Sequence, residues 1–184
     1  MINYEIENEL KQSLSSNEKL VWSGKPKTGI VFRSTDIFLI PFSFLWAGFA
    51  LFWESTVIIH DAPILFKLWG IPFILVGLYV TIGRFFLDAK KRAGTTYGIT
   101  ANRIIIMSGI FNKEIKSLNI KTLSDITIIE KSDRSGTITF GPTDFRATMM
   151  EGFDWPGAKQ PPKLDFIEEV KIVYDKIIDL QKQS

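Results

Sequence analysis

The sequence predicts an α+β membrane protein, in which a two-helix transmembrane hairpin is joined to an antiparallel β-barrel capped by a C-terminal α-helix. Two observations lead to this fold class. Two long runs in the first half of the chain contain no charged residue, and the second half alternates short β-prone stretches with turn residues. A final amphipathic stretch has the periodicity of a helix that packs on those strands.

Residues 37–53 and 68–83 form the two charge-free runs. At 1.5 Å per residue, each covers about 25 Å of helix, a little less than the roughly 30 Å hydrocarbon core of a bilayer. The first run can be lengthened through Ile59, and the second back to Ile64 or forward to Leu87. We therefore expect each run to span a membrane.

Small residues predict how the two helices pack. Gly70 and Gly77 are seven residues apart and share one helical face, and Ala47, Gly48 and Ala50 are small enough to pack closely against that face. The alternative is a soluble, fully buried helical hairpin. It is disfavoured, because so small a domain cannot cover two helices that are apolar on every side.

Loop cations predict the orientation of the hairpin. Lys and Arg residues flank it on both outer sides, whereas the connecting loop holds Lys67 against Glu54 and Asp61. Because positive charge favours the cytoplasmic side, both termini are expected in the cytoplasm. The predicted location is the bacterial cytoplasmic (inner) membrane, with a multi-pass topology.

The chain divides into three predicted regions. Residues 1–36 form a cytoplasmic N-terminal region, residues 37–87 the transmembrane helical hairpin, and residues 88–184 the cytoplasmic strand-rich domain. Within the first region, the apolar spacing favours a short helix over residues 3–15. A brief strand over residues 20–22 is expected to follow it.

Short β-prone stretches with turn residues between them follow the hairpin. The pair Ala101-Asn102 suits a tight hairpin, since Asn tolerates positive φ, and residues 132–136 suit a longer turn. The spacing of the stretches favours a small antiparallel barrel or sandwich. The expected strands are Thr95–Thr100, Arg103–Ser108, Lys113–Leu118, Leu123–Glu130, Gly136–Gly141 and Phe145–Met150.

A C-terminal amphipathic helix is predicted over residues 163–182. Asp165 and Glu168 resemble a capping box at its start. Such an apolar stripe usually packs on its own domain, and a partner helix is the alternative. The stripe consists of Phe166, Val170, Val173, Ile177 and Leu180.

The segment 151–162 interrupts the strand pattern with Gly, Pro and two aromatic residues. This composition is typical of functional loops, and also of plain connections. We expect Phe153 and Trp155 to form a partner-binding loop, with an ordinary connection as the alternative.

Composition limits the chemistry of the chain. It has no Cys, one His and a net charge of +2. No thiolate nucleophile, Cys-ligated zinc or iron–sulfur cluster is possible, and a single imidazole is available. The small net charge disfavours nucleic acid as a partner. We expect no catalytic residues, no metal and no cofactor; an intramembrane enzyme that uses Glu54, His60 or Asp61 is the minority hypothesis.

Short motifs follow one another in order along the chain, from Glu18–Pro26 before the hairpin to Gly136–Gly141 among the strands. Between them lie Ile40–Ser43, Trp46–Ala50, Phe52–Glu54, Trp69–Phe73, Gly77–Tyr79, Gly83–Phe86 and Thr96–Thr100 followed by Arg103. Over about residues 17–180, this order resembles the bacterial PH-like (pleckstrin-homology-like) domain-containing membrane protein family.

The resemblance implies that the antiparallel barrel is PH-like and that the domain is tethered to a membrane. It also implies a scaffold or oligomerisation role with no established enzymatic activity. In PH domains that bind phosphoinositides, the loop between the first two strands carries a cluster of basic residues. In this chain that loop is Ala101-Asn102 with Arg103 alone, so the resemblance favours protein binding over inositide binding.

The leading hypothesis is therefore a non-enzymatic, membrane-anchored PH-like binding or scaffold module. It would act through protein–protein contact or self-assembly as a homo-oligomer, with the lipid bilayer and an unidentified protein as partners. The alternative is a membrane-surface module that senses anionic lipid headgroups. Its candidate residues are Arg84, Lys90, Lys91 and Arg92, because cations near the surface attract anionic lipid.

Overall fold

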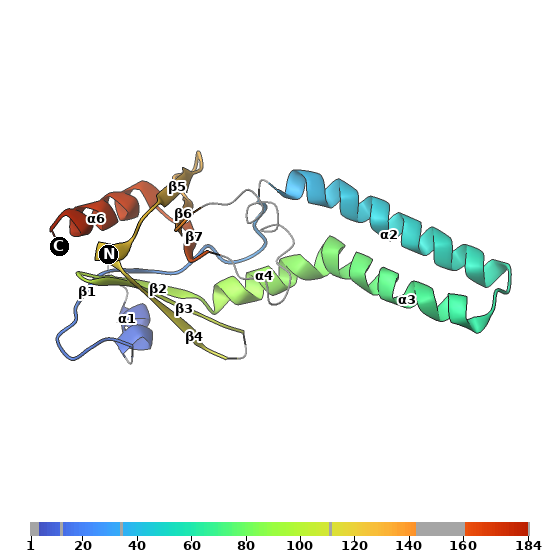
Figure 1. Cartoon of the computed structure of the whole chain (residues 1–184), viewed down its shortest axis with the longest axis horizontal. Helices are drawn as coiled ribbons and strands as arrows, with labels where there is room; N and C mark the ends of the chain where they lie inside the picture. Colours follow the sequence, from blue (N-terminus) through green and yellow to red (C-terminus); the bar gives the residue numbers. More distant parts are fainter. Residues whose placement is uncertain (1–3, 12, 34, 111, 143–160, 184) are drawn as a thin grey trace. The chain divides into compact units, whose positions relative to one another are not determined.

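The computed structural model groups the chain into two compact units, each described separately (Figure 1). The strand-rich unit takes its described residues from 1–29, 89–147 and 159–184, and the hairpin unit from 30–88. The structure describes residues 4–11, 13–33, 35–110, 112–142 and 161–183.

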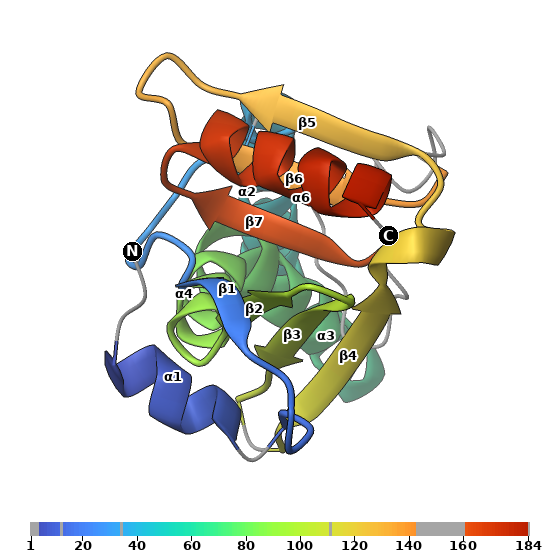
Figure 2. The ribbon, with the colours of Figure 1, turned by 90° about the vertical axis from the view of Figure 1, so that its left-hand side faces the viewer.

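A four-stranded antiparallel sheet, sheet A, forms one half of the strand-rich unit (Figure 2). Its strands lie in the order β1 (Leu20–Gly24), β2 (Thr96–Thr100), β3 (Arg103–Ser108) and β4 (Glu114–Asn119). β1 and β2 are paired neighbours, with Gly24 opposite Tyr97, although residues 30–88 lie between them in the chain. The hairpin is therefore inserted into the connection between two adjacent strands.

A three-stranded antiparallel sheet, sheet B, forms the other half of this unit. A short 3₁₀-helix, η2 (Ile120–Thr122), precedes it, and the C-terminal helix α6 (Val170–Gln183) follows it. Its strands are β5 (Ile126–Glu130), β6 (Gly136–Phe140) and β7 (Lys163–Ile167), in that order. Among the described residues, strand pairing gives two sheets, so the expected closed barrel is not confirmed.

One apolar core lies between the two sheets and α6. Burying these side chains removes apolar surface from water, which is the main favourable term in folding. The fold is thus α+β, and the expected packing of the C-terminal helix on its own domain is confirmed. The core consists of Tyr97, Ile99, Ile104, Ile106, Ile120, Ile138, Phe140, Leu164, Ile167, Val170, Val173 and Ile177.

The other face of sheet A is packed by the N-terminal helix α1 (Tyr4–Lys11), which is shorter than the helix expected over residues 3–15. Its Leu10 packs with Ile105 and Met107 in a second, smaller apolar cluster. Gly98 makes room for this contact, because a Cβ at that position would lie 2.8 Å from Leu10 Cδ1. β2 and most of β3 are therefore covered on both faces, whereas β4 is mostly exposed.

The predicted C-terminal helix begins too early. Lys163–Ile167 form β7, with Leu164 opposite Ile138 of β6, and α6 begins only at Val170. Leu164 to Ile167 are all buried, so this strand lacks the alternation that marks a half-exposed one. The capping box expected at Asp165 and Glu168 is therefore wrong.

Other strand predictions need smaller changes. β5 begins at Ile126, because Leu123 closes η2 and Asp125 adopts a left-handed φ of 51°. The 101–102 turn needs no positive φ; instead Thr100 Oγ1 accepts hydrogen bonds from the backbone N–H groups of Asn102 and Arg103. The expected strand 145–150 lies outside the described residues.

The hairpin unit consists of two antiparallel helices with a four-residue connection. The helices are α2 (Asp36–Ile59) and α3 (Ile64–Leu78), and α3 continues through one π-helical turn, η1 (Tyr79–Gly83), into α4 (Arg84–Ala93). The expected lengthening of both apolar runs is confirmed.

Small residues line the contact between α2 and α3. Gly77 lies against Ala47, and a Cβ at Gly70 would overlap Glu54 Oε2, which confirms the predicted glycine face. Ala50 is buried in the same contact. Gly48 is different: nothing lies within 4 Å of a Cβ built there, so its predicted place in the contact is wrong.

A buried carboxylate fastens the segment before β1 to sheet A. Arg103 donates to both oxygens of Glu18, at 2.8 and 2.6 Å, and Thr100 Oγ1 donates to it at 2.8 Å. The Arg103 hydrogen bonds, with further help from Ser15 and Thr100, lower the pKa of Glu18 from 4.5 to about 2. The ionised form of Glu18 is therefore the one that stabilises the fold.

Glu18→Gln is expected to lower the free energy of unfolding by about 1.5–3 kcal/mol, the range for hydrogen bonds to charged groups. Because the folded-state pKa is depressed, this contribution is complete above the ordinary pKa of 4.5 and is lost as the pH falls toward 2. Thermal unfolding followed by circular dichroism at several pH values checks it. Exposed Glu168→Gln is the control; an equal effect of the two variants at pH 7 would contradict the account.

The insertion of the hairpin makes a second prediction. Replacing residues 30–88 with a flexible Gly/Ser linker of about ten residues keeps β1 next to β2 and is expected to give a folded, soluble protein. A fragment of residues 84–184 lacks β1, exposes the edge of β2 and is expected to aggregate. Size-exclusion chromatography and amide NMR dispersion distinguish the two. Equal behaviour would contradict the observed β1–β2 pairing.

Candidate membrane-surface site

The helix α4 has two different faces, and the residues on each face recur every four positions. The inward face carries Arg84 and Arg92, which are 5% and 4% exposed, with Asp88 between them. The outward face carries two apolar residues, followed one turn later by two lysines: Phe86, Leu87, Lys90 and Lys91. A helix has 3.6 residues per turn, so these two sets lie on separate sides.

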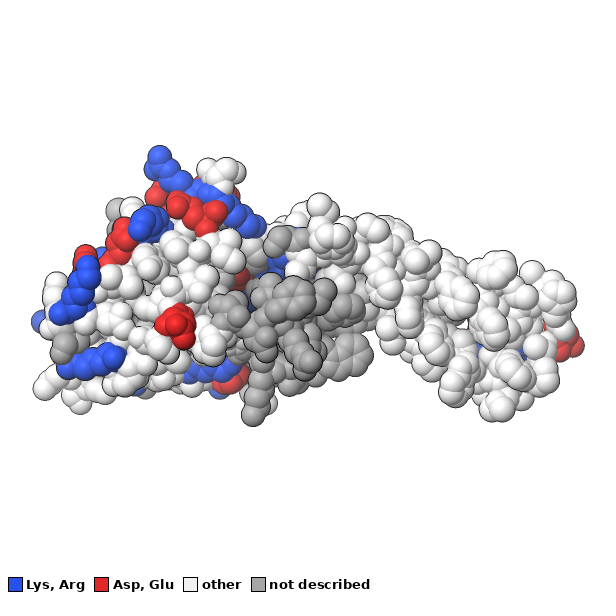
Figure 3. All heavy atoms as spheres, turned by 45° about the horizontal axis from the view of Figure 1, so that its top comes forward, with Lys and Arg blue, Asp and Glu red and all other residues white. Residues whose placement is uncertain are grey.

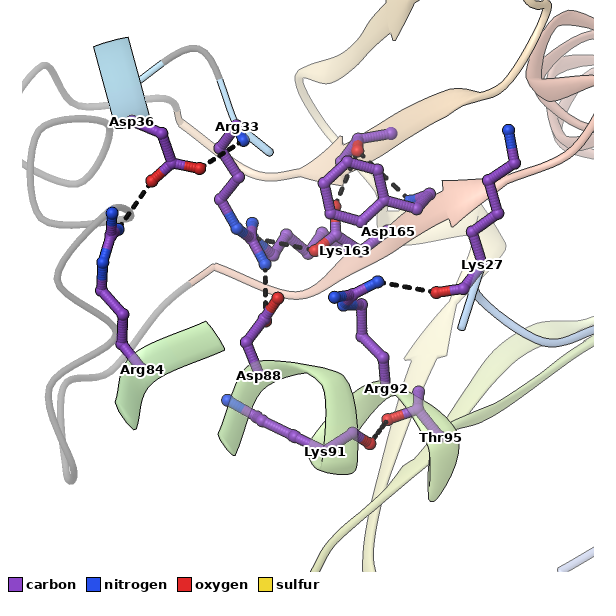
Figure 4. Close-up of polar contacts among 12 residues, drawn as sticks. Lys27, Arg33, Asp36, Arg84, Asp88, Lys91, Arg92, Thr95, Lys163 and Asp165 are labelled. Carbon is purple, nitrogen blue, oxygen red and sulfur yellow. Dashed lines mark hydrogen bonds and ion pairs between the residues drawn. The ribbon is translucent and has the colours of Figure 1, made fainter. Parts of the chain in front are cut away.

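Arg84 is held inside the hairpin unit (Figure 4). Its Nη1 donates to Asp36 Oδ1 at 2.6 Å, and both side chains are almost fully buried. Its Nε donates to the carbonyl of Val80 at 2.8 Å, and the other oxygen of Asp36 accepts from the backbone N–H of Arg33 at 2.7 Å. This ion pair joins the start of α2 to the start of α4.

The other two inward residues are also bound within the chain. Asp88 accepts from Arg33 Nη2 at 2.9 Å in the hairpin unit. In the strand-rich unit, Arg92 donates to the backbone carbonyls of Lys27 and Gly29, at 2.7 and 2.8 Å. Its guanidinium also lies 5.3 Å from the centre of the Phe166 ring.

These contacts change how the basic cluster is interpreted. Arg84 and Arg92 are buried and serve the packing of α4, so a headgroup site that includes them is not supported by their positions. Lys90 and Lys91 are exposed. The candidate site therefore reduces to the outward face of α4.

The outward face has the composition of a membrane interface. Phe86 is 62% and Leu87 43% exposed, and Lys90 and Lys91 lie one turn further along. Long lysine side chains can reach headgroups while apolar neighbours enter the boundary region. Near an anionic leaflet each such cation contributes about 1 kcal/mol. This arrangement can hold a helix at a lipid surface but contains no reactive group.

Asp36, Arg33 and Asp88 were not predicted as members of this region. The sequence contains a signal for the contact between Asp36 and Arg84, because Asp36 precedes the first apolar run and Arg84 follows the second. In an antiparallel hairpin those two ends meet, and opposite charges there are expected to pair.

The other candidates are Phe153, Trp155 and the acidic residues of the hairpin. Phe153 and Trp155 lie outside the described residues. Asp61 is paired with Lys67 at 2.8 Å in the connection between α2 and α3, and Glu54 lies against Gly70. Within the part of the chain that the structure describes, no three His, Cys, Asp or Glu side chains gather in a way that suits a metal ion.

The strand-rich unit thus consists of two antiparallel sheets packed around one core with a C-terminal helix, and a helical hairpin is inserted after its first strand. The family model described as Bacterial PH domain matches residues 42–170, which is more than half of the chain. The chain belongs to this family. No curated protein and no solved structure shows a significant match.

The buried ion pair makes a direct prediction. Asp36→Asn or Arg84→Gln leaves its partner buried without its counter-charge, which is expected to cost about 3–5 kcal/mol of stability. The double variant Asp36→Leu/Arg84→Leu leaves no buried charge and is expected to recover part of this loss. Unfolding by sodium dodecyl sulfate, followed by circular dichroism, measures the differences.

The control is the pair between Asp61, whose side chain is 95% exposed, and Lys67. Asp61→Asn is expected to change stability by less than about 1 kcal/mol, as exposed pairs do. If Asp36→Asn were no more harmful than Asp61→Asn, the structural role assigned to Arg84 would be wrong.

Proposed function

We propose that this protein is a membrane-anchored PH-like binding or scaffold module, without catalytic activity, in the bacterial cytoplasmic (inner) membrane. One observation carries the proposal. The helices Asp36–Ile59 and Ile64–Ala93 are long and apolar enough to cross a membrane, and only 22% and 17% of their most apolar windows is buried. In a soluble protein, helices this apolar are buried on most sides.

The exposed side chains of the hairpin support the same conclusion. Phe38 is 80%, Ile59 77% and Trp69 66% exposed. Leaving such a side chain in water forgoes about 1.5–3 kcal/mol of burial, which a surrounding bilayer supplies. The face visible in Figure 3 shows Lys, Arg, Asp and Glu over the strand-rich unit and few of them along the hairpin.

The proposed topology places both termini in the cytoplasm and the loop of residues 60–63 outside. The Lys and Arg residues that flank the hairpin support this orientation through the positive-inside rule. The tether raises the local concentration of the PH-like unit in the plane of the membrane, so weak contacts become effective. In this proposal the unit acts by contact, with a protein partner or with another copy of itself.

A second candidate function is the recognition of anionic lipid. The outward face of α4 favours it, because Lys90 and Lys91 are exposed there beside Phe86 and Leu87. Both functions require the anchor. They differ in whether the module responds to the composition of the bilayer.

Single-cysteine labelling tests the proposed topology, and the absence of native Cys makes it clean. Asp61→Cys, in the loop between the helices, is expected to react with a membrane-impermeant maleimide from outside the cell. Lys182→Cys, near the end of α6, is expected to react only after the membrane is permeabilised. The parent chain must stay unlabelled. Reaction of Asp61→Cys only after permeabilisation would overturn the topology.

A further inference from the structure

We propose that two copies of this chain meet through the free edge of β4, where the two β4 strands pair antiparallel with Ile115 opposite Ile115. The inference rests on the proposed binding module and deepens it, because it names the partner and the strand that meets it. The contact is isologous: the same patch of each copy faces the other across a two-fold axis.

One edge of β4 is open to a further strand. Among the strands that the structure describes, β4 has one neighbour, β3, with which Glu114 to Asn119 are aligned. In an edge strand, backbone N–H and C=O groups point away from the sheet and form a template for another strand. An added strand satisfies these groups, which is an established mode of protein recognition. The backbone of β4 therefore favours a partner that is itself extended.

The side chains of β4 are exposed on both faces of sheet A. Ile115 lies opposite Met107 of β3, on the face that α1 packs, yet it is 52% exposed whereas Met107 is 5% exposed. Lys116 lies opposite Ile106, on the other face, and is also exposed. Pairing Ile115 with its counterpart removes apolar surface of both copies from water.

The charges of β4 favour a second copy as the added strand. Glu114 and Lys116 lie on the same face of the strand, with Glu114 Oε1 and Lys116 Nζ 3.6 Å apart. When the two-fold axis passes through Ile115, Glu114 of each copy lies directly opposite Lys116 of the other. The contact then contains two cross-strand pairs of opposite charge, which stabilise a sheet. The order Glu-Ile-Lys is thus complementary to itself.

The same charges disfavour the neighbouring alignments. Side chains directly opposite each other in an antiparallel pair lie on the same face, so the axis must pass through a residue and not between two. An axis through Glu114 sets two glutamates opposite each other, and an axis through Lys116 sets two lysines opposite each other. Like charges in that position are destabilising. The alignment centred on Ile115 is therefore the favoured one.

Disulfide cross-linking of the full-length chain in isolated membranes tests the pairing, and the absence of native Cys leaves each introduced thiol unambiguous. Opposite Cα atoms in an antiparallel pair are about 4.5–5.5 Å apart, which a disulfide can bridge. Ile115→Cys is expected to give a dimer on non-reducing gels after oxidation with copper phenanthroline. The matched control is Ile172→Cys on α6, where the isoleucine is 60% exposed, and it is expected to remain monomeric.

The alignment is tested with two chains of different length. Glu114→Cys and Lys116→Cys are produced together, and one of them carries a size tag. These two positions lie opposite each other, so the mixed dimer is expected in large excess. Two Glu114→Cys chains are offset by two residues, about 7 Å along the strands, which places their Cα atoms beyond the range of a disulfide.

The role of charge is tested in the Ile115→Cys chain. Glu114→Lys or Lys116→Glu places two like pairs across the contact, and each is expected to slow cross-linking about tenfold, the scale of two cross-strand charge pairs. The combined variant Glu114→Lys/Lys116→Glu restores opposite charges and is expected to recover the rate. Because it changes the same two positions, its recovery separates the pairing from damage to the fold.

The outcomes distinguish the pairing from the anchored module. Equal cross-linking of Ile115→Cys and Ile172→Cys overturns the pairing, and like dimers as abundant as the mixed dimer overturn the alignment. If the chain resists alkaline carbonate but Ile115→Cys stays monomeric or cross-links to another protein, the self-pairing is overturned while the anchored module stands. If Ile115→Cys dimerises but the chain is released by carbonate, the pairing stands and the anchor is overturned.

Discussion

The rest of the structure depends on the pairing of β1 with β2. These strands are hydrogen-bonded neighbours in sheet A, yet the whole hairpin separates them in the chain. Closing so long a connection costs chain entropy. An antiparallel pair of helices brings its own ends together, because α2 runs outward and α3 returns. The inserted hairpin therefore needs less loop closure to bring β1 beside β2 than an unstructured segment of the same length would need.

Ion pairs and hydrogen bonds hold the segments on both sides of the inserted hairpin. In the hairpin unit the pairs Asp36–Arg84 and Arg33–Asp88 join the segment before α2 to α4. In the strand-rich unit Arg92 binds the carbonyls of Lys27 and Gly29, which follow β1. Buried charges of this kind stabilise a structure only when every partner is present. Because β2 follows the hairpin in the chain, sheet A cannot be completed until both apolar helices have been synthesised.

The sequence predicted the elements whose signals are local. Uninterrupted apolar runs defined α2 and α3, and turn residues separated β2 from β3. It missed β7, because a strand buried on both faces has no alternation, and Phe166 also fits the helical spacing that leads to Val170. It did not indicate that Arg84 and Arg92 are buried, since the partner of a buried charge lies far away in the chain. A basic residue next to an apolar run looks the same in sequence whether it faces lipid or a carboxylate.

Extraction with alkaline carbonate tests most directly whether the inserted hairpin anchors the PH-like module in the membrane. The full-length protein is predicted to stay in the membrane pellet at high pH, as proteins with spanning helices do. A peripheral protein would detach. Release of the full-length chain into the soluble fraction would contradict the account, whatever the partner of the module proves to be.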